Sequence, residues 1–252
     1  MNLTVIILTK NSELNLEKAL KSVEFADEII VLDDRSHDRT EEIALKYTSK
    51  IFKSPLNDDF GAQRNYGLKQ AKGDWILYVD SDEIITPELQ IEIQKVLKSK
   101  DQNLGYYIKR RDIFWGRVLK YGELWNSYRE GIIRLFKKNS GLWEHPVHEK
   151  FVHKGYFGVL NNYIDHYSHN GIKDFIENVN YYSTIRAKEL LKKGKVSNIF
   201  QIFIYPIGKF TVNYLFKLGF LDGVEGFIYA FMMSFHSFLV RAKLYQYTRL
   251  SN

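Results

Sequence analysis

The feature that most constrains the fold is an apolar run that ends abruptly in acids. The run Trp75 to Val79 has the length of a buried strand, and Asp80-Ser81-Asp82-Glu83 follows it directly. A buried strand that ends in acids delivers carboxylates to the carboxyl edge of a sheet, where open α/β sheets bind ligands. Two carboxylates two residues apart can hold one hard divalent cation, so Asp82 and Asp80 are candidate ligands for Mn²⁺ or Mg²⁺. Asp82 is expected to bind directly, and Asp80 to face the ribose or share the cation through water. The alternative is that both aspartates solvate the strand end or cap the next helix.

Strand-like and helix-like segments alternate over the first hundred residues. Strands are expected at 3–8, 28–32, 50–53 and 75–79, and helices at 12–23, 36–47, 60–72 and 86–98. The last helix has the clearest start, because Thr86-Pro87-Glu88 supplies an N-cap, a first-turn proline and a first-turn acid. This alternation predicts an α/β fold with a parallel sheet that is covered on both faces.

The pattern changes after about residue 103. Strands are expected at 105–113, 132–137, 148–153 and 156–160, followed by a long helix at 171–193 and two apolar helices at 198–218 and 222–247. The longest uncharged run, Gly226 to Val240, is shorter than the roughly 18–20 residues that a membrane-spanning helix needs. We therefore expect the last helices to lie on a membrane or to pack as core.

The positive charge of the chain is concentrated near its C-terminus. Residues 184–252 hold ten Lys/Arg and three Asp/Glu, whereas the preceding 183 residues hold 26 Lys/Arg and 27 Asp/Glu. A basic segment this rich in aromatic and aliphatic residues favours an anionic membrane surface over nucleic acid as its partner.

The sequence has no cysteine, and it begins with a strand-like segment that lacks the basic start of a signal peptide. The expected location is the cytoplasm, peripheral on the inner face of the cell membrane.

Four motifs in one order carry a family resemblance over about residues 3–100. They are Thr9-Lys10-Asn11-Ser12-Glu13, Leu32-Asp33-Asp34-Arg35-Ser36-His37-Asp38-Arg39-Thr40, Gln63-Arg64-Asn65-Tyr66-Gly67-Leu68, and Gly73-Asp74-Trp75 leading into Asp80-Ser81-Asp82-Glu83. This series resembles the family 2 glycosyltransferases. The resemblance implies their GT-A fold, which is Rossmann-like, with a mixed, mostly parallel sheet and helices on both faces.

Motifs in the second half narrow the resemblance. They are Arg134-Leu135-Phe136, Val147-His148-Glu149-Lys150, Asp165-His166-Tyr167-Ser168-His169 and Gly219-Phe220-Leu221-Asp222-Gly223. Together they are similar to the branch that adds glucose to the inner core of lipopolysaccharide. The family usually has glycine where this chain has Arg35 and Arg39. The Gln-x-x-Arg-Trp motif of processive synthases is absent, which favours the addition of one sugar.

The resemblance implies a division into a glycosyltransferase domain at 1–170 and a helical region at 171–252. Within the domain, residues 1–103 would bind the nucleotide sugar and residues 104–170 would face the acceptor. The implied activity is inverting, metal-dependent transfer from a nucleoside diphosphate sugar, a UDP-hexose, to a glycan or lipid-linked acceptor in lipopolysaccharide or cell-surface polysaccharide synthesis. No nucleic acid partner is expected, and a homo-oligomer is compatible with the sequence.

The implied site residues each have a structural alternative. Those for the nucleotide sugar are Thr9, Asn11, Glu13, Asp33, Arg64, Asp80 and Arg134. Asp33 is the candidate for the uracil or ribose, or else caps a helix from Ser36. The alternative for Glu13 is an acid in the first turn of a helix, stabilised by the helix dipole. The alternative for Arg64 is a residue on a solvated helix face. Glu149 is the candidate general base, with His148 to orient it or to contact the donor phosphates; the alternative for Glu149 is an exposed residue paired with Lys150.

Two other functions compete with sugar transfer. A sugar nucleotidyltransferase uses a related sheet, but the segment Leu8-Thr9-Lys10-Asn11 lacks the Gly-rich loop typical of that class. A non-catalytic scaffold at a membrane surface is the third interpretation. The presence of Asp80, Asp82 and Glu149 weighs against it.

Overall fold

The computed structural model describes residues 2–57, 59–99, 101–145, 149–169 and 171–250. Its contacts divide the chain into two units, one of residues 1–111 and 129–166 and the other of residues 112–128 and 167–252. The segment 112–128, which the sequence-based division groups with the first 170 residues, thus clusters with the C-terminal helices.

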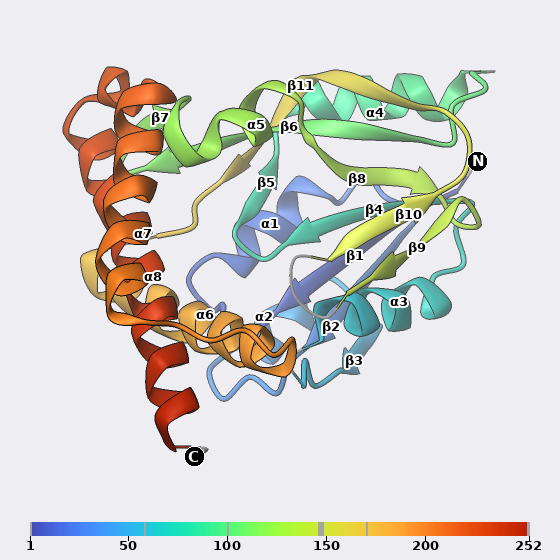
Figure 1. Cartoon of the computed structure of the whole chain (residues 1–252). Coiled ribbons are helices and arrows are strands. Elements are labelled where there is room, and N and C mark those ends of the chain that lie inside the picture. Colours follow the sequence, from blue (N-terminus) through green and yellow to red (C-terminus); the bar gives the residue numbers. More distant parts are fainter. Residues whose placement is uncertain (1, 58, 100, 146–148, 170, 251–252) are drawn as a thin grey trace. The chain divides into compact units, whose positions relative to one another are not determined.

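The first unit is built on a long mixed sheet (Figure 1). Its elements are β1 (Leu3–Thr9), α1 (Leu16–Ser22), β2 (Glu28–Asp33), α2 (Thr40–Ala44), β3 (Ile51–Lys53), α3 (Phe60–Gln70), β4 (Trp75–Asp80), β5 (Glu83–Ile85), α4 (Pro87–Lys98), β6 (Gly105–Phe114, up to Arg111 in this unit), β8 (Ile132–Lys137), β9 (Gly141–Glu144), β10 (Lys150–His153) and β11 (Phe157–His166).

The strand order β3-β2-β1-β4-β8-β6-β11-β5 explains where polar side chains gather. Strands β3, β2, β1 and β4 are parallel, and β8 continues the sheet antiparallel to β4. In this register Thr9 lies beside Asp33, and Leu8 lies beside Asp80. Three polar strand ends therefore meet at one edge, next to the point where the parallel strand order reverses, which is the usual ligand-binding crevice of such sheets.

The alternation of side chains along β1 explains why both faces of the sheet are covered. Every residue of β1 is buried. Val5 and Ile7 belong to one hydrophobic cluster, with residues of α1 and α4, whereas Ile6 and Leu8 belong to another, with Leu68 of α3. Successive strand residues point to opposite faces, so a continuous apolar run marks a strand buried on both sides.

The two loops that follow β1 and β2 are longer than the sequence pattern predicts. The predicted helix starts at Ser12 and Ser36 are wrong, since α1 begins at Leu16 and α2 at Thr40. The reason is that Ser12 donates its backbone N–H to Thr40 Oγ1 at 2.7 Å, and the Ser36 hydroxyl accepts the N–H of Asn11 at 2.8 Å. These groups join the loops to each other instead of extending the helices.

Short strands account for the other differences. Strands β5, β7 and β9 have three or four residues and were not predicted. Strand β11 continues past the predicted end at residue 160, because its last residues pair with β5 and place His166 opposite Glu83. The predicted strand at 148–153 starts in residues outside the described ranges, and the described part is β10.

The second unit is mainly helical. Its elements are the end of β6 from Asp112, β7 (Arg117–Leu119), η1 (Gly122–Leu124), α5 (Trp125–Arg129, whose last residue clusters with the first unit), α6 (Ile172–Lys192), α7 (Ile199–Thr211), the π-helical turn η2 (Val212–Phe216), η3 (Gly219–Asp222) and α8 (Gly223–Leu250). Helix α8 packs along α6 and α7 (Figure 1). Phe114, Phe175 and Met232 belong to its hydrophobic core.

The segment Gly219–Leu250 is long and apolar enough to cross a membrane, by length and composition alone. This differs from the expectation drawn from the uncharged run, which ends at Val240. A core helix of a soluble protein passes the same test, so the composition of α8 does not decide between the two environments.

The N-cap of α4 yields a stability prediction. Thr86 Oγ1 accepts the N–H of Leu89 at 3.2 Å and donates to the carbonyl of Tyr163 at 3.0 Å. Thr86→Ala should lower the free energy of unfolding by about 1–2 kcal/mol in urea titrations. Ser99→Ala, at the exposed end of the same helix, is the control and should change it by less than about 0.5 kcal/mol. Equal losses in the two variants would contradict this role of Thr86.

Candidate functional site

The loops after β1 and β2 form one wall of the site. Asn11 Oδ1 accepts the N–H of His37 at 2.9 Å, and Glu13 Oε2 accepts the N–H of Arg39 at 3.2 Å. Glu13 precedes α1, so the alternative of a first-turn acid is wrong. Thr9 is buried, and its hydroxyl has no hydrogen-bond partner among the described residues. These bonds from side-chain oxygens to backbone N–H groups fix the two loops against each other.

Asp33, the predicted uracil or ribose ligand, lies at the base of this wall. Its carboxylate is fully buried, accepts the N–H of Ser36 at 3.2 Å and pairs with Lys53 Nζ at 2.8 Å. It does not cap a helix from Ser36, because α2 starts four residues later. Arg35, where the family usually has glycine, has a φ of +53°, whereas Arg39 has an ordinary φ of −79°. A left-handed conformation costs a residue other than glycine roughly 1–2 kcal/mol, which explains the family's preference at the first position.

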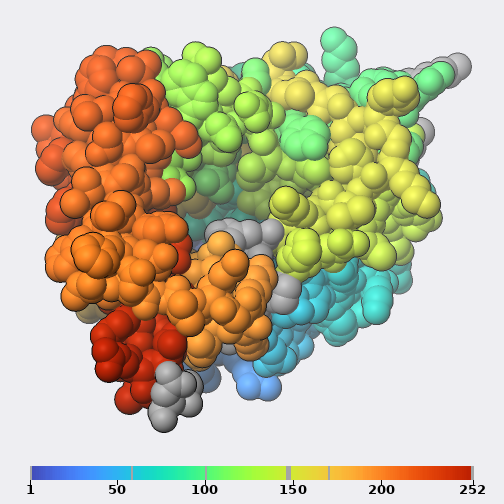
Figure 2. Space-filling model, in the orientation of Figure 1, coloured from blue at the N-terminus to red at the C-terminus, as the bar shows by residue number. Residues whose placement is uncertain are grey.

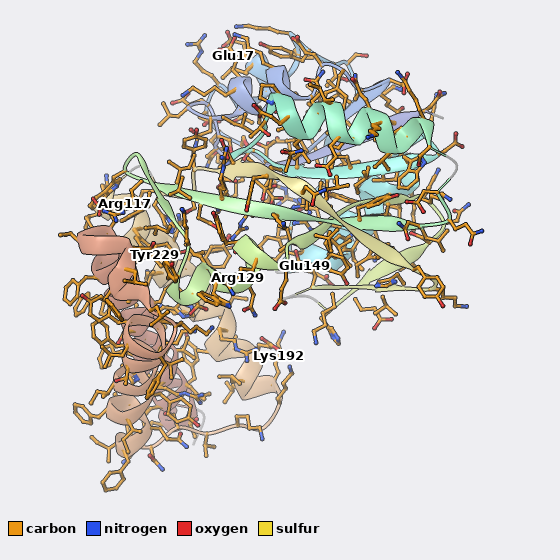
Figure 3. All side chains as sticks on the ribbon, turned by 90° about the horizontal axis from the view of Figure 1, so that it is seen from above. Glu17, Arg117, Arg129, Glu149, Lys192 and Tyr229 are labelled. Carbon is orange, nitrogen blue, oxygen red and sulfur yellow. The ribbon has the colours of Figure 1, made fainter. Side chains whose placement is uncertain are left out.

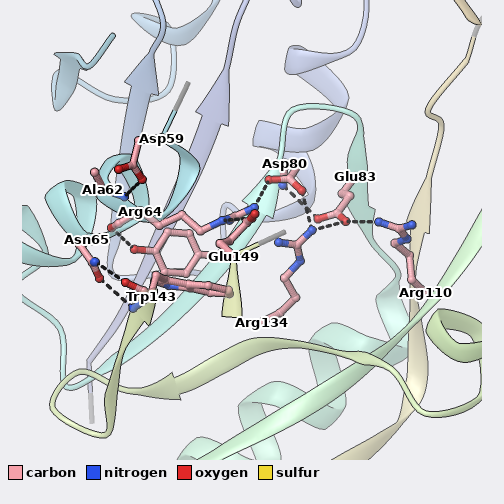
Figure 4. A network of polar contacts seen from close by, with 11 residues as sticks. Asp59, Ala62, Arg64, Asn65, Asp80, Glu83, Arg110, Arg134, Trp143 and Glu149 are labelled. Carbon is pink, nitrogen blue, oxygen red and sulfur yellow. Dashed lines mark hydrogen bonds and ion pairs between the residues drawn. The ribbon is translucent and has the colours of Figure 1, made fainter. Parts of the chain in front are cut away.

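Asp80 lies between two buried arginines (Figure 4). Arg64 Nη2 donates to Asp80 Oδ1 at 3.3 Å, and Arg134 Nη2 donates to Asp80 Oδ2 at 2.5 Å. Arg134 also donates to Glu83 Oε1 at 2.7 Å, and Glu83 Oε2 accepts the N–H of Asp80 at 3.0 Å. Arg64 is therefore not a solvated helix residue, and one ionic network joins α3, β4, β5 and β8.

The arginines set the charge of Asp80. Burial raises the pKa of its carboxyl, but the charges of Arg134 and Arg64 outweigh burial and hold that pKa well below the usual range. Burial acts to lower the pKa of Arg134, and the charges of Asp80 and Glu83 reverse this and raise it. Asp80 is therefore an ionised carboxylate at neutral pH, with an arginine on each oxygen.

Two aromatic rings fix the position of Arg64. Its guanidinium carbon lies 5.3 Å from the centre of the Tyr78 ring and 5.0 Å from that of Trp143. Asn65 bonds the backbone of Trp143 in both directions, donating to its carbonyl at 2.8 Å and accepting from its N–H at 3.0 Å. The Tyr78 hydroxyl donates to the Arg64 carbonyl at 2.5 Å. These contacts hold α3 against β9 and β4 (Figure 4).

Glu149, the predicted general base, lies immediately before β10 and is labelled in Figures 3 and 4. Its Oε1 accepts from Arg64 Nε at 3.0 Å, and the side chain is 19% exposed. The partner that the structure gives it is thus Arg64 rather than Lys150. His148 lies outside the described residues.

Asp82, the predicted metal ligand, faces a histidine that the sequence analysis gave no role. Asp82 Oδ2 lies 3.4 Å from His166 Nε2, and both side chains retain some solvent exposure. A carboxylate and an imidazole together suit Mn²⁺ and similar divalent ions. No group of three or more acidic, histidine or cysteine side chains suited to a metal exists within the described residues. Asp82 and His166 are thus two side chains that could hold a divalent cation.

Glu83 and His166 are the site residues that sequence reasoning missed. Glu83 belongs to the quoted acidic motif but is fully buried, which a strand-end motif does not reveal. His166 reaches Asp82 through the pairing of β11 with β5. The clustering of acids at positions 80–83 could have identified Glu83 as a site residue. His166 could be identified only from the pairing of β11 with β5.

Comparisons with known proteins point to one family. The model of glycosyl transferase family 2 matches residues 4–160. A relative from Rickettsia typhi, named an uncharacterized glycosyltransferase, is 31% identical and covers 96% of this chain and 86% of its own. The lipopolysaccharide core biosynthesis glycosyltransferase of Rhizobium meliloti is 26% identical over 97% of this chain and 92% of its own. The solved structure of S. aureus TarS with UDP-GlcNAc shares the fold, at a TM-score of 0.50 and 17% identity, covering 100% of this chain and 93% of the other.

The ionic network yields a prediction about Arg134. Arg134→Met should lower the free energy of unfolding by about 3–5 kcal/mol, because it leaves Glu83 as a buried charge without its closest partner. Arg110→Met is the control, since Arg110 Nη1 lies 3.9 Å from the same carboxylate and its side chain is more exposed. It should cost less than about 1 kcal/mol. Comparable losses in chemical denaturation would contradict the central position of Arg134.

Proposed function

The chain belongs to glycosyl transferase family 2, and from this premise we propose that it moves one sugar, with inversion, from a UDP-hexose to a glycan or lipid-linked acceptor. It is a glycosyltransferase with the GT-A fold. The observation that carries the finer proposal is the convergence of Asp82 with His166, and of Asp80 with Arg64 and Glu149, at the carboxyl edge of one sheet.

We assign the donor end of the site to the loops that follow β1 and β2, which hydrogen-bond to each other. We assign Asp33 to the uracil N3–H, and Thr9, Asn11 and Glu13 to the same nucleotide. Asp33 lies beside Thr9 in the sheet, and the side chains of Asn11 and Glu13 join the two loops. Arg64 supplies positive charge for the diphosphate. A UDP-sugar complex of a protein with the same fold supports UDP as the nucleotide.

We assign Asp82 and His166 to a divalent cation, Mn²⁺ or Mg²⁺, which they would hold when it binds. Asp80, two residues before Asp82, holds Arg64 and Arg134. When bound, such a cation offsets the negative charge of a departing diphosphate. Arg64 and Arg134 hold the Asp80 carboxylate ionised and in place. His166 is oriented by the pairing of β11 with β5.

Glu149 is assigned as the base that removes the proton of the acceptor hydroxyl. It is paired with Arg64 and its side chain is 19% exposed, so the carboxylate is largely shielded from bulk water while part of it stays accessible. The hydroxyl oxygen attacks the anomeric carbon as its proton moves to Glu149, and UDP leaves. A single displacement of this kind inverts the anomeric centre and needs no covalent enzyme intermediate.

The acceptor is assigned to lipopolysaccharide or a related cell-surface polysaccharide. The Rhizobium meliloti relative is named for lipopolysaccharide core synthesis and covers nearly the whole chain. A lipid-linked acceptor lies at a membrane, so a surface that binds lipid would bring the enzyme to it.

Helix α7 supplies a surface for an anionic membrane at the inner face of the cell membrane. Phe200, Phe203, Ile204 and Ile207 share one helix face and are all exposed, and α7 has no buried residue. In Figure 2 the orange side chains of this region lie at the molecular surface.

The charge of this region fits the same partner. Lys192, Lys193 and Lys195 precede α7, while Glu189 and Glu225 are each paired with a cation. Basic residues beside an exposed apolar stripe are typical of a segment that binds anionic lipid.

The metal assignment predicts that Asp82→Asn lowers transfer by roughly 100-fold or more, because charge stabilisation worth several kcal/mol is lost. His166→Ala should also lower the rate of transfer, for the same reason. Calorimetry with UDP should show an Mn²⁺-dependent gain in affinity for the wild type that both variants lose. Asp101→Asn, an exposed substitution remote from the metal ligands, is the control. A wild type indifferent to EDTA would remove the metal from the proposal.

The base assignment predicts that Glu149→Gln lowers turnover at saturating donor and acceptor by about 10²–10⁴-fold, the usual effect of losing a general base. Glu144→Gln, on the neighbouring β9, is exposed and should retain turnover. The measurement is the initial rate of UDP release in the presence of acceptor. Full activity of the Glu149 variant would show that another residue is the general base.

The membrane assignment predicts that the full chain floats with vesicles rich in phosphatidylglycerol at low salt. Replacing both Phe200 and Phe203 with serine should weaken binding at least about tenfold, since each phenylalanine contributes roughly 1.5–3 kcal/mol on burial. Replacing Leu142 and Val159 with serine is the control, because these exposed residues lie on strands of the first unit. A wild-type protein that stays with the soluble fraction would contradict the assignment.

A further inference from the structure

Arg64 joins two carboxylates that have different tasks in the proposed reaction. Its Nε donates to Glu149 Oε1 at 3.0 Å, and its Nη2 donates to Asp80 Oδ1 at 3.3 Å. Asp80 lies on the donor side and has Arg134 as a second, closer partner. Among the described residues, Arg64 is the cation that pairs with Glu149. The charge of the candidate base is therefore balanced by one guanidinium.

The guanidinium of Arg64 also has an unused donor. Its Nη1 is buried and has no hydrogen-bond partner among the described residues. A buried N–H group left without an acceptor costs about 1–3 kcal/mol, more when the group is charged. The side chain is only 6% exposed and is held over the Tyr78 and Trp143 rings. The guanidinium is therefore held in place, and Nη1 is its remaining N–H donor for the oxygen of a ligand.

We propose that Arg64 is a positioning residue that couples donor binding to the release of Glu149. This inference rests on the proposed function. In the structure Arg64 holds the Glu149 carboxylate. A diphosphate oxygen that binds Nη1 brings negative charge to the same guanidinium and weakens its pair with Glu149. The carboxylate is then free to accept the proton of the acceptor hydroxyl, so the donor binds before the base becomes active.

Thermodynamic linkage turns this into a statement about affinity. If the diphosphate weakens the pair between Arg64 and Glu149, then Glu149 must weaken diphosphate binding by the same factor. Removing the charge of Glu149 should therefore tighten UDP binding, although that variant has lost its base. A residue that merely supported the shape of the site would act in the opposite direction, since its loss would weaken binding.

The test is a double-mutant cycle with UDP and Mn²⁺, read by calorimetry on the full chain. Glu149→Gln should lower the Kd of UDP by about fivefold or more, within the usual range of coupling between sites. Arg64→Met should raise it, and adding Glu149→Gln to Arg64→Met should change it no further. Glu144→Gln is the control and should leave the Kd unchanged.

Two results would overturn the coupling. One is a Kd of UDP for Glu149→Gln that is unchanged or higher than that of the wild type. The other is that Glu149→Gln increases the affinity for UDP as much in the Arg64→Met background as in the wild type. If Arg64→Met does not fold, Arg64→Lys replaces it, because lysine keeps the charge but cannot bridge two carboxylates, so the gain should shrink. Failure of the wild type to bind UDP at all would instead count against the proposed function, so the two failures are distinguishable.

Discussion

The arrangement of the candidate site depends on the burial of Asp80 between two arginines. Arg64 comes from α3 and Arg134 from β8, so this one carboxylate ties a helix and a neighbouring strand to the end of β4. Buried charges are tolerated only when they are paired and hydrogen-bonded, and here each oxygen of Asp80 has its own guanidinium. The same network leaves Asp82, two residues further on, partly exposed beside His166. Asp80 thus holds the network together, and Asp82 is the residue that we assign to a cation.

The sequence was sufficient for the framework of the first unit. Apolar runs of strand length predicted β1, β2 and β4, and the N-cap at Thr86 predicted α4 to the residue. The motifs also predicted that Asp33, Arg64, Asp80 and Glu149 belong to one region, although the roles assigned to them remain proposals. Local patterns succeed here because burial on both faces and capping are decided by neighbouring residues.

What the sequence did not reveal depends on contacts between distant segments. His166 faces Asp82 because β11 pairs with a three-residue strand that has no pattern of its own. Arg64 is buried because Trp143, about eighty residues later, lies against it. The loops at Asn11 and Ser36 satisfy each other's backbone groups, so the predicted helix starts at Ser12 and Ser36 were lost. In each case long-range hydrogen bonding or packing outweighed local propensity.

Membership of the glycosyltransferase family fixes the class of reaction, and the residues of this chain suggest how it is carried out. The exposed apolar face of α7 and the lysines before it belong to the second unit, and we propose them as the surface that binds an anionic membrane. The first unit holds the carboxylates and arginines assigned to the donor. In the proposed function, sugar transfer and membrane binding are thus assigned to separate parts of the sequence.

The stereochemistry of donor cleavage tests the central claim most directly. Time-resolved proton NMR can follow the anomeric proton of the sugar that is released when the enzyme slowly hydrolyses an α-linked UDP-hexose, with water in place of the acceptor. A single displacement assisted by Glu149 predicts that the β-anomer appears first, before mutarotation, together with UDP. Initial release of the α-anomer, or of a sugar phosphate and UMP, would contradict the account.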